Sequence, residues 1–182
     1  MSRSQSGREF LVEIATMRAE PGSRRELHIE APIEDLAVSE ARVPGGAPIV
    51  VDVLLESVSG GILVSGTVRA PWVGECRRCL EEAKGTIEAE IRELCELEPY
   101  DEELTYRLSR EQLDLLPIAH DACILELPLA PLCREDCLGL CPNCGVNRNL
   151  ETCSCQPVRG GHFAVLSVLQ HAEENDHPAQ EN

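Results

Sequence analysis

The sequence predicts an α+β fold: an antiparallel β-rich meander, open or curled into a partly closed barrel, with a few helices and a cysteine-rich C-terminal segment. Apolar and polar residues alternate along several stretches, which is typical of strands with one buried face. These stretches follow one another closely, which favours antiparallel pairing. Six of the ten cysteines lie between residues 131 and 156.

The first third of the chain gives mixed signals. Residues 9–17 (EFLVEIATM) fit either a first strand or a short helix. Residues 24–32 (RRELHIEAP) alternate as a strand does, with Leu27 and Ile29 on one face. Residues 31–48 have turn residues and little periodicity, so we interpret them as a loop with a turn at its two glycines.

The clearest β signal is a hairpin. Apolar residues occupy every second position from Ile49 to Leu55 and again from residue 62 to 68. Between these runs, residues 59–61 (Ser-Gly-Gly) supply the positive φ angles that tight hairpins need. Residues 72–80 are expected to form a third strand or its end, and residues 86–97 a fourth strand, half buried and half solvated.

A helix is predicted near residues 115–126, after a polar connection at 99–112 that has room for a short helical turn. Asp114 is a plausible N-cap, Pro117 fits the first turn, and Pro128 ends the helix. Its predicted apolar stripe is Leu115, Ile118, Ala119, Ala122 and Leu125. Residues 162–172 predict a short closing helix.

Composition and charge narrow the classes of function. Only 3% of the residues are aromatic, so a core of small aliphatic residues would benefit from a cross-link. The formal net charge of −16 argues against non-specific nucleic-acid binding. No targeting segment and no apolar run long enough for a membrane span is visible, so we expect a cytoplasmic protein. In that reducing compartment clustered thiols bind metal more often than they form disulfides.

The cysteine spacing is typical of zinc sites. Zinc takes four thiolates in a tetrahedron, and two cysteines two or three residues apart can bind one ion. Cys141-Pro142-Asn143-Cys144-Gly145 has the form of a zinc knuckle, in which Gly145 permits a left-handed backbone. The C-terminal segment is therefore expected to be a zinc-knuckle segment.

Eight of the ten cysteines lie in close pairs, which suggests two structural zinc ions. Proximity predicts one site from the last four of these cysteines and a second from the other four; the residues are Cys141, Cys144, Cys153 and Cys155, then Cys76, Cys79, Cys133 and Cys137. The second site would tie the β region to the segment beyond the helix. The alternative is one ion held by the C-terminal six cysteines.

The two remaining cysteines, Cys95 and Cys123, lie on apolar faces and are interpreted as small buried residues. Two rival chemistries use the same thiols: a thioredoxin-like dithiol, which needs its motif to open a helix, and an iron–sulfur cluster. No histidine pair, phosphate loop or nucleophile elbow supports an enzyme, and no small-molecule substrate is expected.

The domain prediction follows from these elements. Residues 1–130 form the β-rich domain with the helix near 115–126. Residues 131–171 form the cysteine-rich zinc-binding segment with the closing helix, and residues 172–182 form a disordered tail.

Three stretches in order, GTVRAPWVGECRRCL, LELPLAPLCREDCLGLCPNCGVNRN and CSC with a closing FAVLSVL, carry a family resemblance. They resemble the YceD-like large ribosomal RNA accumulation proteins of bacteria and plastids, from about residue 48 to 171. Arg148 departs slightly, since the family often has Leu between the two asparagines.

The resemblance implies a non-catalytic ribosome-biogenesis factor that supports large-subunit rRNA synthesis, processing or stability. Its partner would be ribosomal RNA, touched locally around Arg77 and Arg78, or a basic ribosomal or assembly protein that fits the acidic surface. Alternatives are a thiol- or zinc-dependent enzyme and a zinc-ribbon adaptor in transcription.

Overall fold

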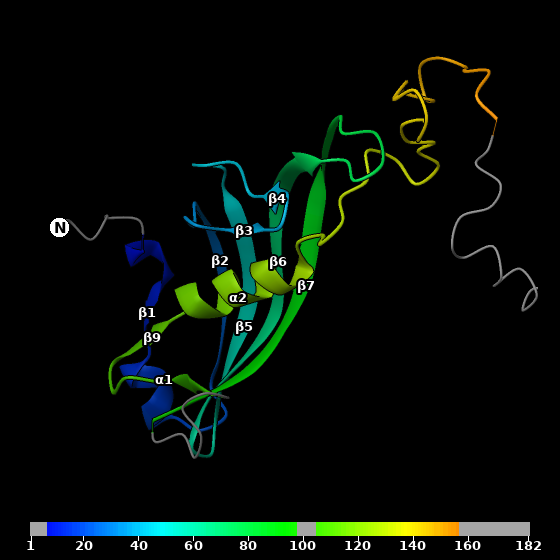
Figure 1. Cartoon of the computed structure of the whole chain (residues 1–182). Coiled ribbons are helices and arrows are strands. Elements are labelled where there is room, and N and C mark those ends of the chain that lie inside the picture. Colours follow the sequence, from blue (N-terminus) through cyan, green and yellow to red (C-terminus); the bar gives the residue numbers. More distant parts are fainter. Residues whose placement is uncertain (1–6, 98–104, 157–182) are drawn as a thin grey trace, which may run out of the picture.

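The structure, a computed structural model, describes residues 7–97 and 105–156. Two long strands, β6 (Gly61–Glu75) and β7 (Glu82–Glu96), pair antiparallel along their whole length. β5 (Ile49–Val58) pairs antiparallel with β6, and β2 (Arg24–Ala31) with β5. The predicted meander is therefore confirmed, and its order in space is β2-β5-β6-β7 (Figure 1). Among the described residues this sheet stays open, so the barrel alternative is not what forms.

The alternation of β5 explains why the sheet has one core face. Its residues alternate between buried and half-buried from Ile49 to Val58. Leu55 is fully buried and lies opposite Val64, and Val51 lies opposite Val68, which in turn faces Ala89. The apolar residues of successive strands thus stack on one face, as the sequence pattern requires.

The predicted hairpin between β5 and β6 is confirmed, although of Ser59, Gly60 and Gly61 only Gly60 has a positive φ. Val58 pairs with Gly61, which leaves Ser59 and Gly60 as a two-residue loop. Gly60 has a φ of 94°, in the left-handed region that such a loop needs. The stretch 72–80 proves to be the end of β6 followed by a turn, and the fourth strand begins at Glu82, earlier than the pattern indicated.

The interpretation of residues 31–48 as loop is partly wrong. Two short strands, β3 (Ala37–Val38) and β4 (Ala41–Arg42), pair with each other, and Arg42 pairs with Val73 of β6. Leu36 and Ala41 are buried in the core. A pair of two-residue strands has no room to show periodicity, so it gives no sequence signal.

The N-terminal stretch contains both of the elements left open by the sequence. A 3-10 turn, η1 (Arg8–Phe10), leads into β1 (Leu11–Glu13), and α1 (Ala15–Ala19) follows. β1 pairs with β9 (Gln112–Asp114), and β8 (Tyr106–Arg107) lies parallel to the end of β7. No helical turn occurs among residues 105–112, and the rest of the polar connection lies outside the described residues.

The helix α2 (Leu116–Glu126) crosses the sheet and packs on β7 and β6 (Figure 1). It begins two residues after Asp114, whose Oδ1 accepts the backbone N–H of Leu116 at 2.9 Å. Pro117 lies in the first turn, as predicted. Leu125 is wrongly placed in the predicted stripe, because it is 85% exposed and Leu127, just past the helix, is buried instead.

The predicted closing helix at 162–172 and the tail at 172–182 lie outside the described residues.

A second apolar cluster lies at the far end of the β6–β7 hairpin, where Cys76, Cys79, Ala83 and Cys137 are buried together. Trp72 packs against both this cluster and the main core, so it joins the sheet to the cysteine segment.

Two adjacent leucines on β5, one buried and one half-buried, test which face of the sheet packs against the core. Leu55→Ala should lower the free energy of unfolding by about 2–5 kcal/mol, because the side chain is fully buried and leaves a cavity. Leu54→Ala is the matched control on the half-exposed face and should cost about 1 kcal/mol. Urea denaturation of the two variants measures the difference, and equal losses would contradict the described facing.

Candidate metal centre

Eight cysteine sulfurs gather into two sets of four. We name them site 1, comprising Cys76, Cys79, Cys133 and Cys137, and site 2, comprising Cys141, Cys144, Cys153 and Cys155. Within each set all Sγ atoms lie within 4.8 Å of one another. All ten cysteines lie in the described residues, and none forms a disulfide. The structure thus brings together the same two sets that proximity in the sequence predicted.

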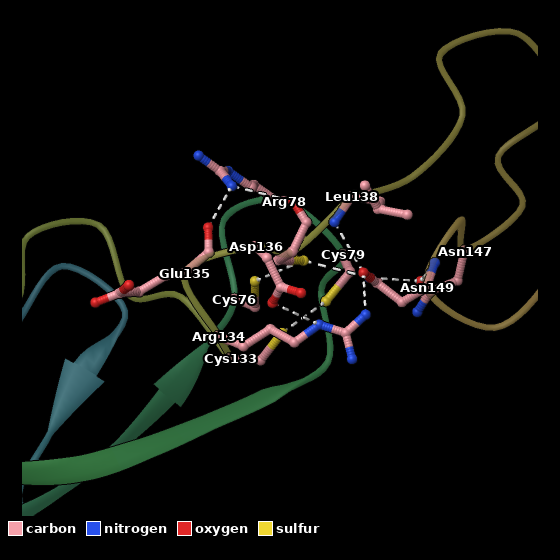
Figure 2. A network of polar contacts seen from close by, with 11 residues as sticks. Cys76, Arg78, Cys79, Cys133, Arg134, Glu135, Asp136, Leu138, Asn147 and Asn149 are labelled. Atoms are coloured by element: carbon pink, nitrogen blue, oxygen red, sulfur yellow. Dashed lines mark hydrogen bonds and ion pairs between the residues drawn. The ribbon is translucent and has the colours of Figure 1, made fainter.

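The spacing of the sulfurs fits a tetrahedral ion. Four ligands at the Zn–S distance of about 2.3 Å place neighbouring sulfurs about 3.8 Å apart. In site 1, Sγ of Cys76 lies 3.8 Å from Sγ of Cys137, and Sγ of Cys79 lies 3.6 Å from Sγ of Cys133. Figure 2 shows the sulfurs of Cys76, Cys79 and Cys133 gathered in one place. Either set could therefore hold a metal ion without rearrangement of the backbone.

One half of site 1 comes from the tip of the β6–β7 hairpin. Glu75 and Glu82 are the last paired residues, so residues 76–81 form the connecting loop. The backbone N–H of Cys76 donates to the carbonyl of Glu81 at 2.8 Å, and that of Leu80 donates to the carbonyl of Cys76 at 2.9 Å. This tight loop turns Cys76 and Cys79 toward the same point.

The other half of site 1 comes from the chain beyond α2, and hydrogen bonds hold it to the hairpin tip. Backbone N–H groups of Arg77 and Leu140 donate to the carbonyl oxygens of Pro131 and Arg78, each at 2.9 Å. The guanidinium of Arg78 donates to the carbonyls of Glu135 and Cys137, each at 3.0 Å (Figure 2). The backbone of residues 131–140 therefore lies alongside the hairpin tip and is held to it by hydrogen bonds.

A glycine permits this close approach. Gly139 has a φ of 70°, and a Cβ at this position would lie 2.9 Å from the carbonyl oxygen of Arg78. That oxygen already accepts from Leu140, so it cannot move aside without losing its hydrogen bond. Only glycine satisfies both conditions.

Site 2 is built on the predicted knuckle. Gly145 has a φ of 75°, which confirms the left-handed backbone expected there. Its N–H donates to the carbonyl of Cys141 at 2.9 Å, and the N–H of Cys141 donates to the carbonyl of Val146 at 2.8 Å. Cys153 and Cys155 close the site from a stretch without helix or strand, which the Asn143 amide joins by donating to the carbonyl of Gln156.

Local hydrogen bonds and burial give the thiols within each site different pKa values. Burial raises the pKa of Cys76, but backbone N–H donors from Cys133, Arg78 and Cys79 outweigh it and lower the pKa to about 6. Burial and the neighbouring thiols raise the pKa of Cys133 to about 12. Four adjacent thiolates repel one another, so all four lose their protons together only when a cation binds.

The thiols of site 2 also differ in pKa. The backbone N–H groups of Cys144 and Asn143 lower the pKa of Cys141 to about 6. Hydrogen bonds to the thiols of Cys144 and Cys141, followed by burial, raise the pKa of Cys155 to about 12. Each site thus has at least one thiol that ionises readily and can capture the ion first.

The two remaining cysteines behave as small buried residues, as the sequence indicated. Cys95 and Cys123 are both fully buried. Burial raises the pKa of Cys95 to about 12 and that of Cys123 to about 11. Neither belongs to a set of metal-ligating side chains in the described part of the chain.

Asn149 is a site residue that the sequence reasoning missed. Its Nδ2 lies 3.3 Å from Sγ of Cys137. Burial raises the pKa of Cys137, and the Asn149 amide leads the contacts that bring it below its ordinary value. The signal for it in the sequence is the pair of asparagines that flanks Arg148.

The thioredoxin-like alternative lacks its required context. That chemistry needs the dithiol motif to open a helix. In this structure Cys79 is followed by β7, and Cys144 by the turn at Gly145.

The two arginines predicted to contact a partner, Arg77 and Arg78, are both exposed. The guanidinium of Arg78, however, donates to carbonyl groups of the cysteine segment.

Comparison with known proteins defines the family. The model of the family described as large ribosomal RNA subunit accumulation protein YceD matches residues 64–170, which include all eight ligand candidates. The chain belongs to this YceD family. No helix in the described residues is long and apolar enough to cross a membrane.

Relatives are found among mycobacteria. Proteins of Mycobacterium tuberculosis and Mycobacterium bovis, both described only as uncharacterized, are 41% identical over 143 residues, covering 74% of this chain and 69% of their own. A Mycobacterium leprae protein, also uncharacterized, is 41% identical over 113 residues, 58% of this chain and 52% of its own. No solved structure matches the chain.

Metal counting tests the two-site partition. The chain purified with its metal should carry two zinc ions by native mass spectrometry. Cys79→Ala and Cys141→Ala should each bind one ion, because each removes one ligand from a different set of four. Cys123→Ala is the matched control and should keep both. A wild-type chain that carries only one ion, and keeps it in Cys79→Ala, would instead support the C-terminal arrangement, and a brown colour would indicate an iron–sulfur cluster.

Proton release gives an independent test. In each site two thiols have raised pKa values, Cys79 with Cys133 and Cys153 with Cys155, so they stay protonated at pH 7.5 without metal. Zinc binding should release at least these two protons per ion, and the zinc affinity should fall at least about 100-fold for each pH unit of acidification. An indicator dye in weak buffer measures the release. Binding that is independent of pH between 7 and 8 would contradict thiolate ligation.

Proposed function

We propose that this protein is a non-catalytic factor that supports the accumulation of large-subunit ribosomal RNA, through its synthesis, processing or stability. The observation that carries the proposal is membership of the YceD family over residues 64–170. Within this unit the best-organised chemical feature is the pair of tetra-cysteine sites, and no substrate pocket is needed to explain it. We place this activity in the cytoplasm, where the thiols would remain reduced.

We further propose that both sites hold zinc and that the zinc is structural. Each set offers four thiolates, so an ion would have no open position for a substrate or a reactive water. A structural zinc contributes an apparent ~10–16 kcal/mol at neutral pH. That is a large term for a chain in which 3% of residues are aromatic and the formal net charge is −16.

In this proposal the two parts of the chain have different roles. The β-rich domain of residues 1–130 is the platform, and residues 131–171 form the zinc-binding segment that docks on it. The backbone hydrogen bond from the N–H of Arg77 to the carbonyl of Pro131 joins the two parts at their boundary.

The proposed direct partner is a basic ribosomal or assembly protein. A formal net charge of −16 attracts such a protein and repels RNA phosphates at long range. Both arginines are exposed, but Arg78 donates to two carbonyl oxygens, so we assign the local contact with ribosomal RNA to Arg77. The protein can therefore bind a basic ribosomal protein through its acidic surface and contact ribosomal RNA through Arg77 in the same complex.

Deletion and complementation test the proposed function. Cells of the source organism that lack the gene should show a lower ratio of large- to small-subunit ribosomal RNA. Wild-type protein and the control Cys123→Ala should restore the ratio, whereas Cys79→Ala should not, because it opens the set that joins the hairpin to the cysteine segment. An unchanged ratio in the deletion strain would refute the proposal.

Affinity capture from the same cells separates the alternatives. Recovery of ribosomal components supports the proposal, and recovery of RNA polymerase without them would instead indicate a transcription adaptor. Thiol–disulfide exchange by the metal-free protein would indicate an enzyme.

A further inference from the structure

The side chain of Asn149 joins the two cysteine sites. In the sequence Asn149 lies between Cys144 and Cys153, inside the loop that site 2 closes. In space its amide nitrogen lies 3.3 Å from Sγ of Cys137, a member of site 1 (Figure 2). One residue therefore belongs by sequence to the loop of one site and by contact to a sulfur of the other.

The orientation of this amide is determined by its other contacts. Its Oδ1 accepts the backbone N–H of Leu138 at 2.8 Å and Nη2 of Arg134 at 2.7 Å. Both partners can only donate, so the oxygen must face them and the nitrogen must face Cys137. The same nitrogen donates to Oδ1 of Asn147 at 2.8 Å, and that oxygen also accepts the backbone N–H of Asn149 at 3.0 Å.

We propose that Asn149 is a positioning residue that couples metal binding at the two sites, an inference that rests on the proposal that both sets hold an ion. An ion in site 2 closes the loop between Cys144 and Cys153 and so holds the Asn149 amide at the Cys137 sulfur. There the N–H stabilises the thiolate that site 1 presents to its own ion. By linkage, an ion in site 1 raises the affinity of site 2 by the same factor.

Backbone contacts also connect the sites, and they set the design of the test. The N–H of Leu140 donates to the carbonyl of Arg78 at 2.9 Å, and the N–H of Arg148 donates to the carbonyl of Gly139 at 3.0 Å. A change confined to the Asn149 side chain leaves these bonds in place. Asn149→Asp is the sharpest change, because it keeps the oxygen that accepts from Leu138 and removes the N–H that faces the sulfur.

The experiment measures the coupling factor with cobalt(II) as the probe, through the sulfur-to-cobalt charge-transfer absorption of the full-length protein. Cys141→Ala gives the affinity of site 1 alone and Cys79→Ala that of site 2 alone. The coupling factor is the overall two-ion binding constant of the intact chain divided by the product of these two affinities. We expect a factor of about 10 or more in the wild-type background.

The same three measurements are repeated with Asn149→Asp and with Arg148→Ala. Asn149→Asp should bring the coupling factor close to one and weaken site 1 by about 10- to 100-fold. Arg148→Ala is the matched control on the same loop, since its exposed side chain makes no hydrogen bond to a cysteine sulfur among the described residues, and it should leave the factor unchanged. Circular dichroism checks that each variant keeps its sheet.

Each outcome is decisive. Two ions that bind with a coupling factor of one in the wild-type background would overturn the coupling and leave the metal sites intact. A factor that survives Asn149→Asp would assign the coupling to the backbone and overturn the role of Asn149. No cobalt bound to the wild-type chain would refute the metal proposal itself. If Asn149→Asp does not fold, Asn149→Ser, which also lacks the amide donor, replaces it under the same criteria.

Discussion

The junction between the β6–β7 hairpin tip and the chain beyond α2 is the constraint on which the rest of this structure depends. Site 1 takes two sulfurs from each side, and the two sides are separated by more than fifty residues of sequence. Closing a loop of that length costs conformational entropy, and the backbone bonds of Arg77 and Leu140 offset only part of it. The ion proposed for site 1 would be shared by both sides and would add stabilisation to that of the aliphatic core.

The order of dependence between the sites follows from this geometry. Site 1 rests directly on paired strands, because its hairpin loop continues the ladder between Glu75 and Glu82. In the described part of the chain site 2 has no strand of its own beneath it, and its links toward the hairpin tip and site 1 include the N–H of Leu140 and the Asn149 side chain. The position of site 2 is therefore inherited from site 1. This dependence concerns position, whereas the proposed coupling between the two affinities is the same in both directions.

Sequence alone predicted what repeats or clusters along the chain. Alternation identified β5, β6 and β7, and the paired spacing grouped all eight cysteines into the same two sets of four that the structure brings together. Isolated contacts between distant residues gave no such signal. The strands β3 and β4 are two residues long, Leu125 fits the helical period yet is exposed, and the carbonyl contacts of Arg78 exist only after the segment docks. Asn149 was missed for the same reason, because its sulfur partner is twelve residues away and belongs to the other site.

The limits of the family match carry a further physical meaning. The match begins at Val64, within β6, and continues through β7, α2 and both cysteine sites, whereas β2 and β5 precede it. The matched unit is thus the hairpin, the helix that covers it and the two sites at its tip. β2 and β5 extend the same sheet and bury its face, so they support this unit without contributing a metal ligand. Within the matched residues the hairpin tip and the cysteine-rich end carry every candidate metal ligand, so the metal chemistry available to this chain lies inside the family match.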